Sequence, residues 1–345
     1  MKKYFLPILL AISLMISMSI NVIADENTEN TVNEDSTVKI SFVGDCTLGS
    51  FLGSSNSFGK YWNKYGSEYF FSNVKPIFES DDITFVNLEG PLTTHKQEAV
   101  KEFSMRGEPE YINILTDGSV EAVNLANNHA RDCGMTGYND TIDLLLNNNI
   151  MYCRDDSIAM MENNGIRTAF IGFNGWAVTD DLCNQIKRNI ELAKKVANIV
   201  CVEFHWGEER NHYSNTVQET LGHFAIDCGA DIVVGAHSHC LQGIELYNNK
   251  LIVYSLGNFC FGGNSNPSDK DTMIFQVEFN KDGVYKNTNI IPCKISSVNN
   301  TNDFKPTVAT EVDAVQIMKN LEKYSKKYEY SIFNIDSKGN TDNDN

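Results

Sequence analysis

Basic residues are scarce in this sequence, and their scarcity limits the partners it can have. The 345 residues include 28 Lys and Arg against 45 Asp and Glu, which gives a net charge of -17. Loss of Lys2 and Lys3 with an N-terminal leader would change it to -19. A broad basic surface for nucleic acid is therefore not expected. Tight binding of a polyanion over a wide area is also disfavoured, although a local basic cluster or a metal ion can reverse the field at one site.

A CxxC motif is also lacking, and the number of cysteines, nine, is odd. Cys201 and Cys260 lie inside apolar segments, whereas Cys46, Cys133 and Cys240 lie close to polar motifs. Buried free cysteine behaves as a small hydrophobic residue. We therefore expect mostly reduced thiols, with a structural disulfide as the alternative for an exported chain.

The first 24 residues have the layout of an export segment. Two lysines precede an uncharged run over residues 4–24, and residues 22–24 (VIA) place small side chains where a signal peptidase reads. We expect a signal peptide that is cleaved before Asp25. The alternative is an uncleaved N-terminal anchor, because the run is long enough to cross a bilayer. No cysteine ends the run, which argues against a lipoprotein anchor.

Composition divides the rest of the chain into three parts. Residues 25–37 are acidic and almost devoid of apolar side chains, which is typical of an unstructured linker. Residues 38–299 are expected to form one globular domain. Residues 300–345 form a polar C-terminal extension, in which apolar residues at helical spacing over 312–328 predict a docked terminal helix. The tail from residue 337 is expected to be disordered.

Apolar, β-branched runs alternate with amphipathic segments throughout the central domain. This alternation predicts an α/β fold with mainly parallel strands between helical layers. Strands are predicted at residues 38–43, 83–87, 122–125, 168–172, 199–203, 231–234, 251–254 and 272–279. Helices are predicted at residues 74–80, 109–117, 137–147, 180–196 and 216–228.

Two histidines follow the apolar run 232–234, after a small-residue turn. His237 and His239 are one residue apart and can face the same point. Ligands of open α/β sheets bind at the carboxyl ends of the strands, and neutral imidazole is the commonest protein ligand for transition metals. The alternative is a pair of surface histidines. Of only seven histidines, however, four follow apolar runs, namely His129, His205, His237 and His239. That pattern favours a metal site.

Other predicted strands end in polar side chains of the same kind. Asp45 and Glu89 each follow a buried-looking strand, where a carboxylate can reach a cation, although each is also typical of a solvated turn. His205 ends another strand, beside Trp206 and the carboxylate of Glu209. The alternative is that His205 is a core histidine whose ring nitrogens are hydrogen-bonded within the protein.

The sequence Asn-Asn-His at residues 127–129 is unusual for a plain turn after a hydrophobic strand. The amide oxygen of Asn128 can bind a metal, while His129 turns to the other side as an acid or base. Asp132 is placed to fix the tautomer of His129. Asn258 follows a further strand in a glycine turn, where it is either a substrate contact or a left-handed turn residue.

Six motifs occur in order between Ile40 and Phe261, roughly two thirds of the chain: GDCTLG, NLEGPLT, LANNHARDCG, EFHWGEE, GAHSHCLQGIE and YSLGNF. Together they resemble the capsule-synthesis CapA family, also called the poly-γ-glutamate synthesis protein family, of the calcineurin-like metallophosphoesterase superfamily. The resemblance implies an α/β fold of four layers, an αββα sandwich of two mixed sheets flanked by helices. It also implies a metal site at the strand ends.

Carried onto this sequence, the resemblance implies a role for each motif residue. His129 matches the proton-donating histidine. The metal ligands that it implies are Asp45, Glu89, Asn128, His205, His237 and His239. Two departures matter, because Thr47 stands where the superfamily has a histidine, and Glu89 replaces a bridging aspartate with a longer arm. One tight divalent ion, or two of unequal affinity, is therefore expected. Mixed nitrogen and oxygen ligation suits manganese, iron or zinc.

Three classes of function are compatible with these motifs. The first is an exported metal-dependent hydrolase that acts on a phosphoester or a γ-glutamyl amide of the cell envelope. The second is a non-catalytic metal- and polymer-binding subunit of a membrane polymer-synthesis complex. The third is a module that senses an anionic envelope ligand. The expected partners are thus an envelope polymer or a small anionic substrate, and the expected location is secreted or attached to the outer face of the cytoplasmic membrane of a bacterium.

Three residues are expected on the substrate side of the site: Trp206, Glu209 and Asn258. Trp206 is the larger aromatic residue beside His205 and lies past the predicted strand end. We expect it to shield the metal from bulk water, because a dry wall strengthens electrostatic interactions inside a site.

Overall fold

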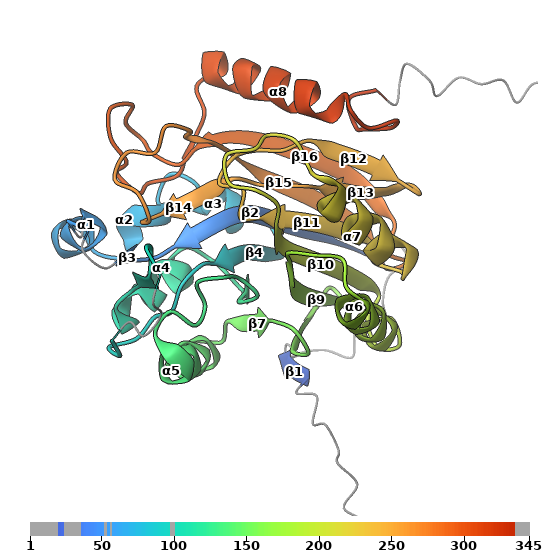
Figure 1. The fold of residues 1–345 in the computed structure, drawn as a ribbon, viewed down its shortest axis with the longest axis horizontal. Coiled ribbons are helices and arrows are strands. Elements are labelled where there is room, and N and C mark those ends of the chain that lie inside the picture. The colour runs from blue at the N-terminus through green and yellow to red at the C-terminus, as the bar shows by residue number, and fades with distance from the viewer. Residues whose placement is uncertain (1–19, 24–35, 52–53, 56, 97–100, 335–345) are drawn as a thin grey trace, which may run out of the picture.

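The computed structural model describes residues 20–23, 36–51, 54–55, 57–96 and 101–334, and Figure 1 shows their arrangement. Most of the predicted signal segment and acidic linker, and the C-terminal tail, lie outside the described residues. Residues of the predicted signal segment that are described form a short strand, β1 (Ile20–Ile23). Among the helices of the described residues, none combines the length and apolar character needed to cross a membrane.

Two mixed sheets form the centre of the molecule. The first contains β1 and the strands β8 (Ile158–Asn163), β9 (Ile166–Gly175), β10 (Ile199–Trp206), β11 (Ile232–Ala236), β12 (Ile244–Tyr247) and β13 (Lys250–Val253). Its order is β1-β8-β9-β10-β11-β13-β12. Strands β9, β10, β11 and β13 are parallel, so their carboxyl ends meet at one edge.

The second sheet contains β2 (Thr37–Thr47), β4 (Ile83–Leu88), β6 (Ala122–Asn124), β7 (Met151–Cys153), β14 (Asn258–Phe261), β15 (Asp271–Asn280), β16 (Tyr285–Lys294) and β17 (Thr307–Val308). Its order is β17-β16-β15-β2-β4-β6-β7, and β14 pairs with β2. Strands β2, β4, β6 and β7 are parallel, whereas β15 and β16 are antiparallel additions. A separate pair, β3 (Ser50–Phe51) and β5 (Met105–Arg106), lies beside this sheet.

The two sheets pack face to face through a shared hydrophobic core. Phe85 of β4 stacks on Phe170 of β9, with ring centroids 4.6 Å apart, and Phe42 of β2 contacts both rings. Alternate residues of a strand point to opposite faces, so each sheet also presents an outer face that helices must cover.

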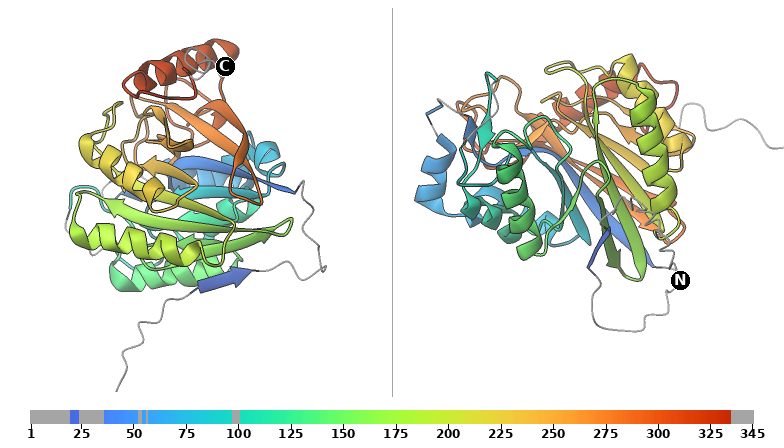
Figure 2. Two further views of the ribbon diagram at one scale, coloured as in Figure 1. Left: turned by 90° about the vertical axis from the view of Figure 1, so that its right-hand side faces the viewer. Right: turned by 60° about the horizontal axis from the view of Figure 1, so that its bottom comes forward.

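Helices cover both outer faces. The second sheet is covered by α1 (Ser57–Tyr65), α2 (Glu68–Phe71), α3 (Lys75–Phe78), the 3-10 turn Pro109–Tyr111, α4 (Ile112–Asp117) and α5 (Gly134–Asn147). The first is covered by α6 (Asp180–Ala193) and α7 (Thr216–Asp227). Figure 2 shows the resulting order of helix, sheet, sheet and helix. The predicted four-layer αββα sandwich is confirmed.

The C-terminal helix α8 (Glu311–Ser325) lies across the open side of the two sheets, over β12 and β16 (Figure 1). It begins at Thr310, whose side chain accepts a hydrogen bond from the backbone N–H of Asp313. Ile317 and Leu321 are fully buried in the core between the sheets. The helix predicted within residues 312–328 is therefore present, and it closes the core.

A half-buried carboxyl group lies at the opposite end of the second sheet from the predicted site. Glu121 directly precedes β6, and its Oε2 accepts a hydrogen bond of 2.8 Å from the backbone N–H of Thr84. Burial, with a smaller contribution from the charge of Asp81, raises the pKa of Glu121 from 4.5 to about 7. The folded state therefore holds this proton more tightly than the unfolded state. The stabilisation is complete below about pH 4.5 and is lost as the pH rises through about 7.

Glu121→Gln is expected to remove this pH dependence and to stabilise the fold by about 2 kcal/mol at pH 7.5, because Gln keeps the acceptor without a buried charge. Urea unfolding at pH 5 and pH 7.5, with chelator present, measures the effect. The exposed Glu110→Gln is the matched control. An unchanged pH slope in Glu121→Gln would contradict the assignment.

Candidate metal centre

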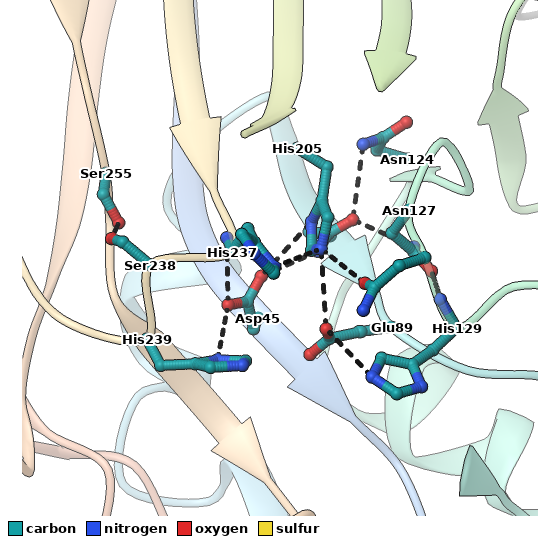
Figure 3. Close-up of polar contacts among 12 residues, drawn as sticks. Asp45, Glu89, Asn124, Asn127, His129, His205, His237, Ser238, His239 and Ser255 are labelled. Carbon is teal, nitrogen blue, oxygen red and sulfur yellow. Dashed lines mark hydrogen bonds and ion pairs between the residues drawn. The ribbon is translucent and has the colours of Figure 1, made fainter. Parts of the chain in front are cut away.

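The polar residues predicted at the strand ends converge on one point between the two sheets, as Figure 3 shows. The second sheet contributes side chains at and after the ends of β2, β4 and β6, and the first sheet contributes side chains at and after the ends of β10 and β11. These residues are Asp45, Glu89, Asn128, His129, His205, His237 and His239. A site shared by two sheets forms only when both are folded and packed.

Three possible ligand atoms surround the Nε2 atom of His205 and form one group with it. This atom lies 2.8 Å from Asn128 Oδ1, 3.1 Å from His237 Nδ1 and 3.6 Å from Glu89 Oε1. A second group of three residues, Asp45, Glu89 and His239, offers ligand atoms within 4.8 Å of one another. Glu89 belongs to both groups, which is the position of a bridging carboxylate.

A β-bulge aims Asp45 at this point. The pairing of β2 with β4 shifts register between Val43 and Asp45, and a bulge re-aims the side chain that follows it. Gly44 at the bulge packs so closely that a Cβ atom would lie 1.8 Å from the carbonyl oxygen of Gly257. The backbone N–H of Asp45 donates to this same oxygen at 3.0 Å. Glycine is therefore required before Asp45.

The turn after β11 holds its two histidines in a strained backbone. His237 has φ of 92° and His239 has φ of 55°, values that non-glycine residues rarely adopt. The backbone N–H of His237 donates to Asp45 Oδ2 at 3.2 Å, and the Ser238 hydroxyl donates to the carbonyl of Cys240 at 2.9 Å. Backbone strain that is held in place by its surroundings is typical of functional sites.

The three imidazoles differ in charge. Burial, together with the neighbouring His237, lowers the pKa of His205 well below its usual value. Burial, together with His239, lowers the pKa of His237 to about 4. Both rings are thus neutral near pH 7, as metal ligands must be. Burial also opposes the charge of His239, but the hydrogen bond to Asp45 and the charge of Glu89 outweigh it and raise the pKa to about 9.

The donor set fits a divalent transition metal. Oε2 of Glu89 accepts a hydrogen bond of 3.0 Å from Thr47, the residue found where a histidine was expected. Within the described part of the chain, the buried Oε1 of Glu89 has no hydrogen-bond partner. A buried carboxylate oxygen without a partner is costly, and a cation would satisfy it. Burial and the charge of Asp45 accordingly raise the pKa of Glu89.

His129 lies beside these groups rather than within them. Its Nδ1 is 2.7 Å from Asp132 Oδ2, whereas its Nε2 is 3.9 Å from Glu89 Oε1. Asp132 is held in turn by the ammonium of Lys101 at 2.6 Å and by the backbone N–H of Met105 at 2.6 Å. The ring is thus oriented by a carboxylate, with Nε2 turned to the centre.

A cavity of about 340 Å³ opens next to the centre. Its lining includes two histidines of the centre, two residues of the loop after β10 and two residues of β14, namely His129, His239, Glu209, Arg210, Asn258 and Phe261. Asn258 Oδ1 lies 2.9 Å from Nδ1 of His239. Glu209 and Asn258 are therefore next to the centre, as their predicted substrate-binding role requires.

The predicted position of Trp206 is wrong. It follows His205 on β10, so it points to the other face of the sheet, where it is fully buried under the helices. Its ring stacks on Phe204 at 4.5 Å, and its Nε1 donates to the carbonyl of Tyr254 at 2.8 Å. The aromatic residue at the centre is Trp176, whose ring meets His237 edge-on at 4.7 Å.

Three residues of the centre were not anticipated from sequence. Asn87 donates to Asp45 Oδ1 at 2.7 Å and lies 3.1 Å from His205 Nδ1. Its position near the end of β4, two residues before Glu89, was the available indication. Lys101 and Trp176 lie in loops with no motif of their own, and only the fold brings them to the centre.

Comparison with known proteins identifies the family of this chain. Residues 39–263 match the family model described as bacterial capsule synthesis protein PGA_cap. The chain belongs to this family. It is 33% identical over 271 residues to the PGA biosynthesis protein CapA of Bacillus subtilis (strain 168), a match that covers 72% of this chain and 70% of that protein. The capsule biosynthesis protein CapA of Bacillus anthracis is 30% identical over 277 residues, 72% of this chain and 66% of that protein. The resemblance to the CapA family is confirmed.

Solved structures with a similar arrangement are more distant. The 5'-nucleotidase from Candida albicans superposes with a TM-score of 0.43 and 11% identity, over 86% of this chain and 59% of that one. The protein TT1561 of Thermus thermophilus gives a TM-score of 0.42, also at 11% identity, over 71% of this chain and all of that one. Likenesses this distant do not bear on function.

Proposed function

We propose that this PGA_cap-family chain is an exported, metal-dependent hydrolase with a phosphoesterase-type site, acting in the synthesis or processing of a capsule or poly-γ-glutamate-like envelope polymer. The observation that carries the proposal is the convergence of carboxylate, amide and imidazole ligands around Glu89, whose Oε1 has no hydrogen-bond partner among the described residues. The family and the names of its Bacillus relatives support the envelope-polymer context.

The metal would be held in two adjacent positions that share Glu89. Asn128, His205 and His237 would complete the first, and Asp45 and His239 the second. The first position has two neutral imidazoles, whereas the second must displace the proton of His239, so the affinities should differ. A bound divalent cation supplies Lewis acidity and a bound water of lowered pKa.

The chain's own residues would then move the proton and hold the substrate. His129, oriented by Asp132, has its Nε2 on the cavity side, where it can protonate a leaving oxygen or nitrogen. Lys101 forms an ion pair of 2.6 Å with Asp132 and so helps to hold this carboxylate in place against the ring. Asn258 and Glu209 border the space that a substrate would occupy, and Trp176 limits the access of water to His205 and His237.

A second role is favoured by the names of the relatives, which are biosynthesis proteins rather than hydrolases. In that role the same centre binds metal and polymer without turnover, as a subunit of a membrane polymer-synthesis complex. Attachment to the outer face of the cytoplasmic membrane suits this role, and secretion suits the hydrolase. A chromogenic phosphoester and a γ-glutamyl anilide, each assayed with manganese, iron and zinc, separate the two roles. Metal binding without turnover of either compound would favour the subunit.

Metal binding itself is the first expected result. The chain from residue 25, purified without chelator, should retain about one equivalent or more of a transition metal by elemental analysis. After the metal is removed, manganese or zinc at about 100 times the dissociation constant should stabilise the fold by about 2.7 kcal/mol, a rise in melting temperature of about 4 °C. His223→Asn, a histidine outside the centre that contacts Glu245, is the control and should behave as the parent. Absence of both metal and thermal shift would refute the centre.

A further inference from the structure

A second group of metal-type ligands lies outside the centre described above, around His212. The side chains of His212, Cys240 and Asp269 offer one ligand atom each within 4.8 Å of one another. They come from three separate loops: the one between β10 and α7, the turn after β11, and the one between β14 and β15. Cys240 is buried and the other two residues are half-buried.

The tautomer of His212 is set by the backbone. Its Nδ1 lies 2.9 Å from the carbonyl oxygen of Leu241, an atom that can only accept a hydrogen bond, so Nδ1 carries a proton. In the neutral ring, Nε2 therefore presents its lone pair to Asp269 Oδ2, 3.7 Å away. A backbone carbonyl that accepts from one ring nitrogen while the other faces a cation is the usual arrangement of metal-binding histidines.

The distance between His212 Nε2 and Asp269 Oδ2 fits two ligands of one metal ion better than a direct hydrogen bond. A distance of 3.7 Å between Nε2 and Oδ2 is too long for a hydrogen bond. It is close to the edge of a tetrahedral zinc site, about 3.4 Å for bonds of about 2.0–2.1 Å. The other oxygen of Asp269 accepts from the backbone N–H of Asp271 at 3.0 Å, which fixes the carboxylate and leaves Oδ2 for a ligand.

We propose that His212, Cys240 and Asp269 form a second metal site, separate from the centre at Glu89. One nitrogen, one sulfur and one oxygen ligand select a borderline ion such as Zn²⁺, and a solvent molecule completes the tetrahedron. The thiol of Cys240 gives up its proton when the metal–sulfur bond forms, with no change of oxidation state. All nine cysteines lie in the described part of the chain and none of them is in a disulfide, so the thiol of Cys240 can bind a metal.

The site would join the loops that form one wall of the cavity. Asp269 lines the cavity, and Cys240 directly follows His239 of the centre. The ring of His212 also stacks on Tyr324 of α8, with centroids 4.6 Å apart. An ion at this position would therefore connect the cavity wall to the C-terminal helix and hold the turn that carries His237 and His239.

Cobalt titration under reducing conditions tests the proposal, because Co²⁺ replaces Zn²⁺ and reports sulfur ligation through an intense thiolate-to-metal charge-transfer band in the near ultraviolet. The parent chain, stripped of metal, should develop this band, and zinc should abolish it. Cys240→Ser should lose the band. Cys228→Ser, a half-buried cysteine outside the cluster, should keep it, and so should His237→Asn, which alters the other centre.

Two results of the cobalt titration would rule out the second metal site. Cobalt uptake by the parent chain without the band, or a band that persists in Cys240→Ser, would overturn the proposal. Melting temperatures in chelator show whether the variants fold. If Cys240→Ser does not fold, His212→Gln provides the answer, because His212 is only half-buried whereas Cys240 is buried. It should weaken cobalt binding at the sulfur-containing site by about tenfold or more, and an unchanged titration would overturn the proposal.

Discussion

His129→Asn is expected to keep its metal and to lose about 10²- to 10⁴-fold in the rate of hydrolysis, the contribution usual for a general acid. The reason is geometric. His129 Nε2 lies 3.9 Å from the nearest oxygen of Glu89, while its Nδ1 is fixed by Asp132, so the ring is oriented toward a substrate beside the metal ligands. Replacement of His129 should therefore leave metal binding intact and remove the group that protonates the leaving group.

His237→Asn should, unlike His129→Asn, weaken metal binding. His237 belongs to the group around His205 Nε2, so its loss should lower metal affinity and the metal-dependent rise in melting temperature together. The paired measurements are elemental analysis, melting with and without manganese, and initial rates on a chromogenic phosphoester. Two variants that both lose metal, or that both hydrolyse at the parental rate, would contradict the division between acid and ligand.

Trp206→Ala is expected to cost about 3–5 kcal/mol of folding stability, the range for replacing a buried large aromatic residue with alanine. Trp206 is fully buried, stacks between Phe204 and Tyr254, and loses a hydrogen bond to the carbonyl of Tyr254 when it is removed. The cavity would lie under the helical layer, away from the metal ligands.

Trp176→Ala is the matched control for that variant. Trp176 is 47% exposed, so its loss should cost less than about 1 kcal/mol of stability. Because its ring contacts His205 and His237, the replacement should instead change metal affinity and turnover. Urea unfolding in chelator and metal titration measure the two effects. If Trp206→Ala unfolds like the parent, or Trp176→Ala leaves the centre unchanged, the two tryptophans have been assigned to the wrong faces.

Strands that are buried on both faces were predictable. All eight predicted strands are present, because continuous apolar runs rich in β-branched residues, such as residues 232–234 and 251–253, have few other stable arrangements. Of the helices, the five predicted in the domain are present, whereas α1 and α2 were missed. α2 has only four residues, too few to show a helical period. α1 does carry aromatic side chains at helical spacing, Phe58, Tyr61, Trp62 and Tyr65, and this pattern was overlooked.

Several strands were also missed, among them β7, β8, β12, β14 and β16. β16 has mostly half-buried or exposed residues and lacks a continuous apolar run, and it pairs along its length with β15. Such a strand is determined by the strand it pairs with, because strand preference depends on cross-strand and same-face neighbours. β14 has four residues and pairs with β2 at the site itself.

The sequence by itself determined which residues could bind a metal, because each ligand follows a strand whose carboxyl end must lie at one edge of a parallel sheet. Thus Asp45, Glu89 and His205 were all placed from order and spacing. Only the tertiary structure decided which ligands share a position, because the two sheets meet through packing that no local pattern encodes. It also decided that Trp206 lies in the core and Trp176 at the centre, since a residue's face depends on strand register, and one residue along a strand reverses it.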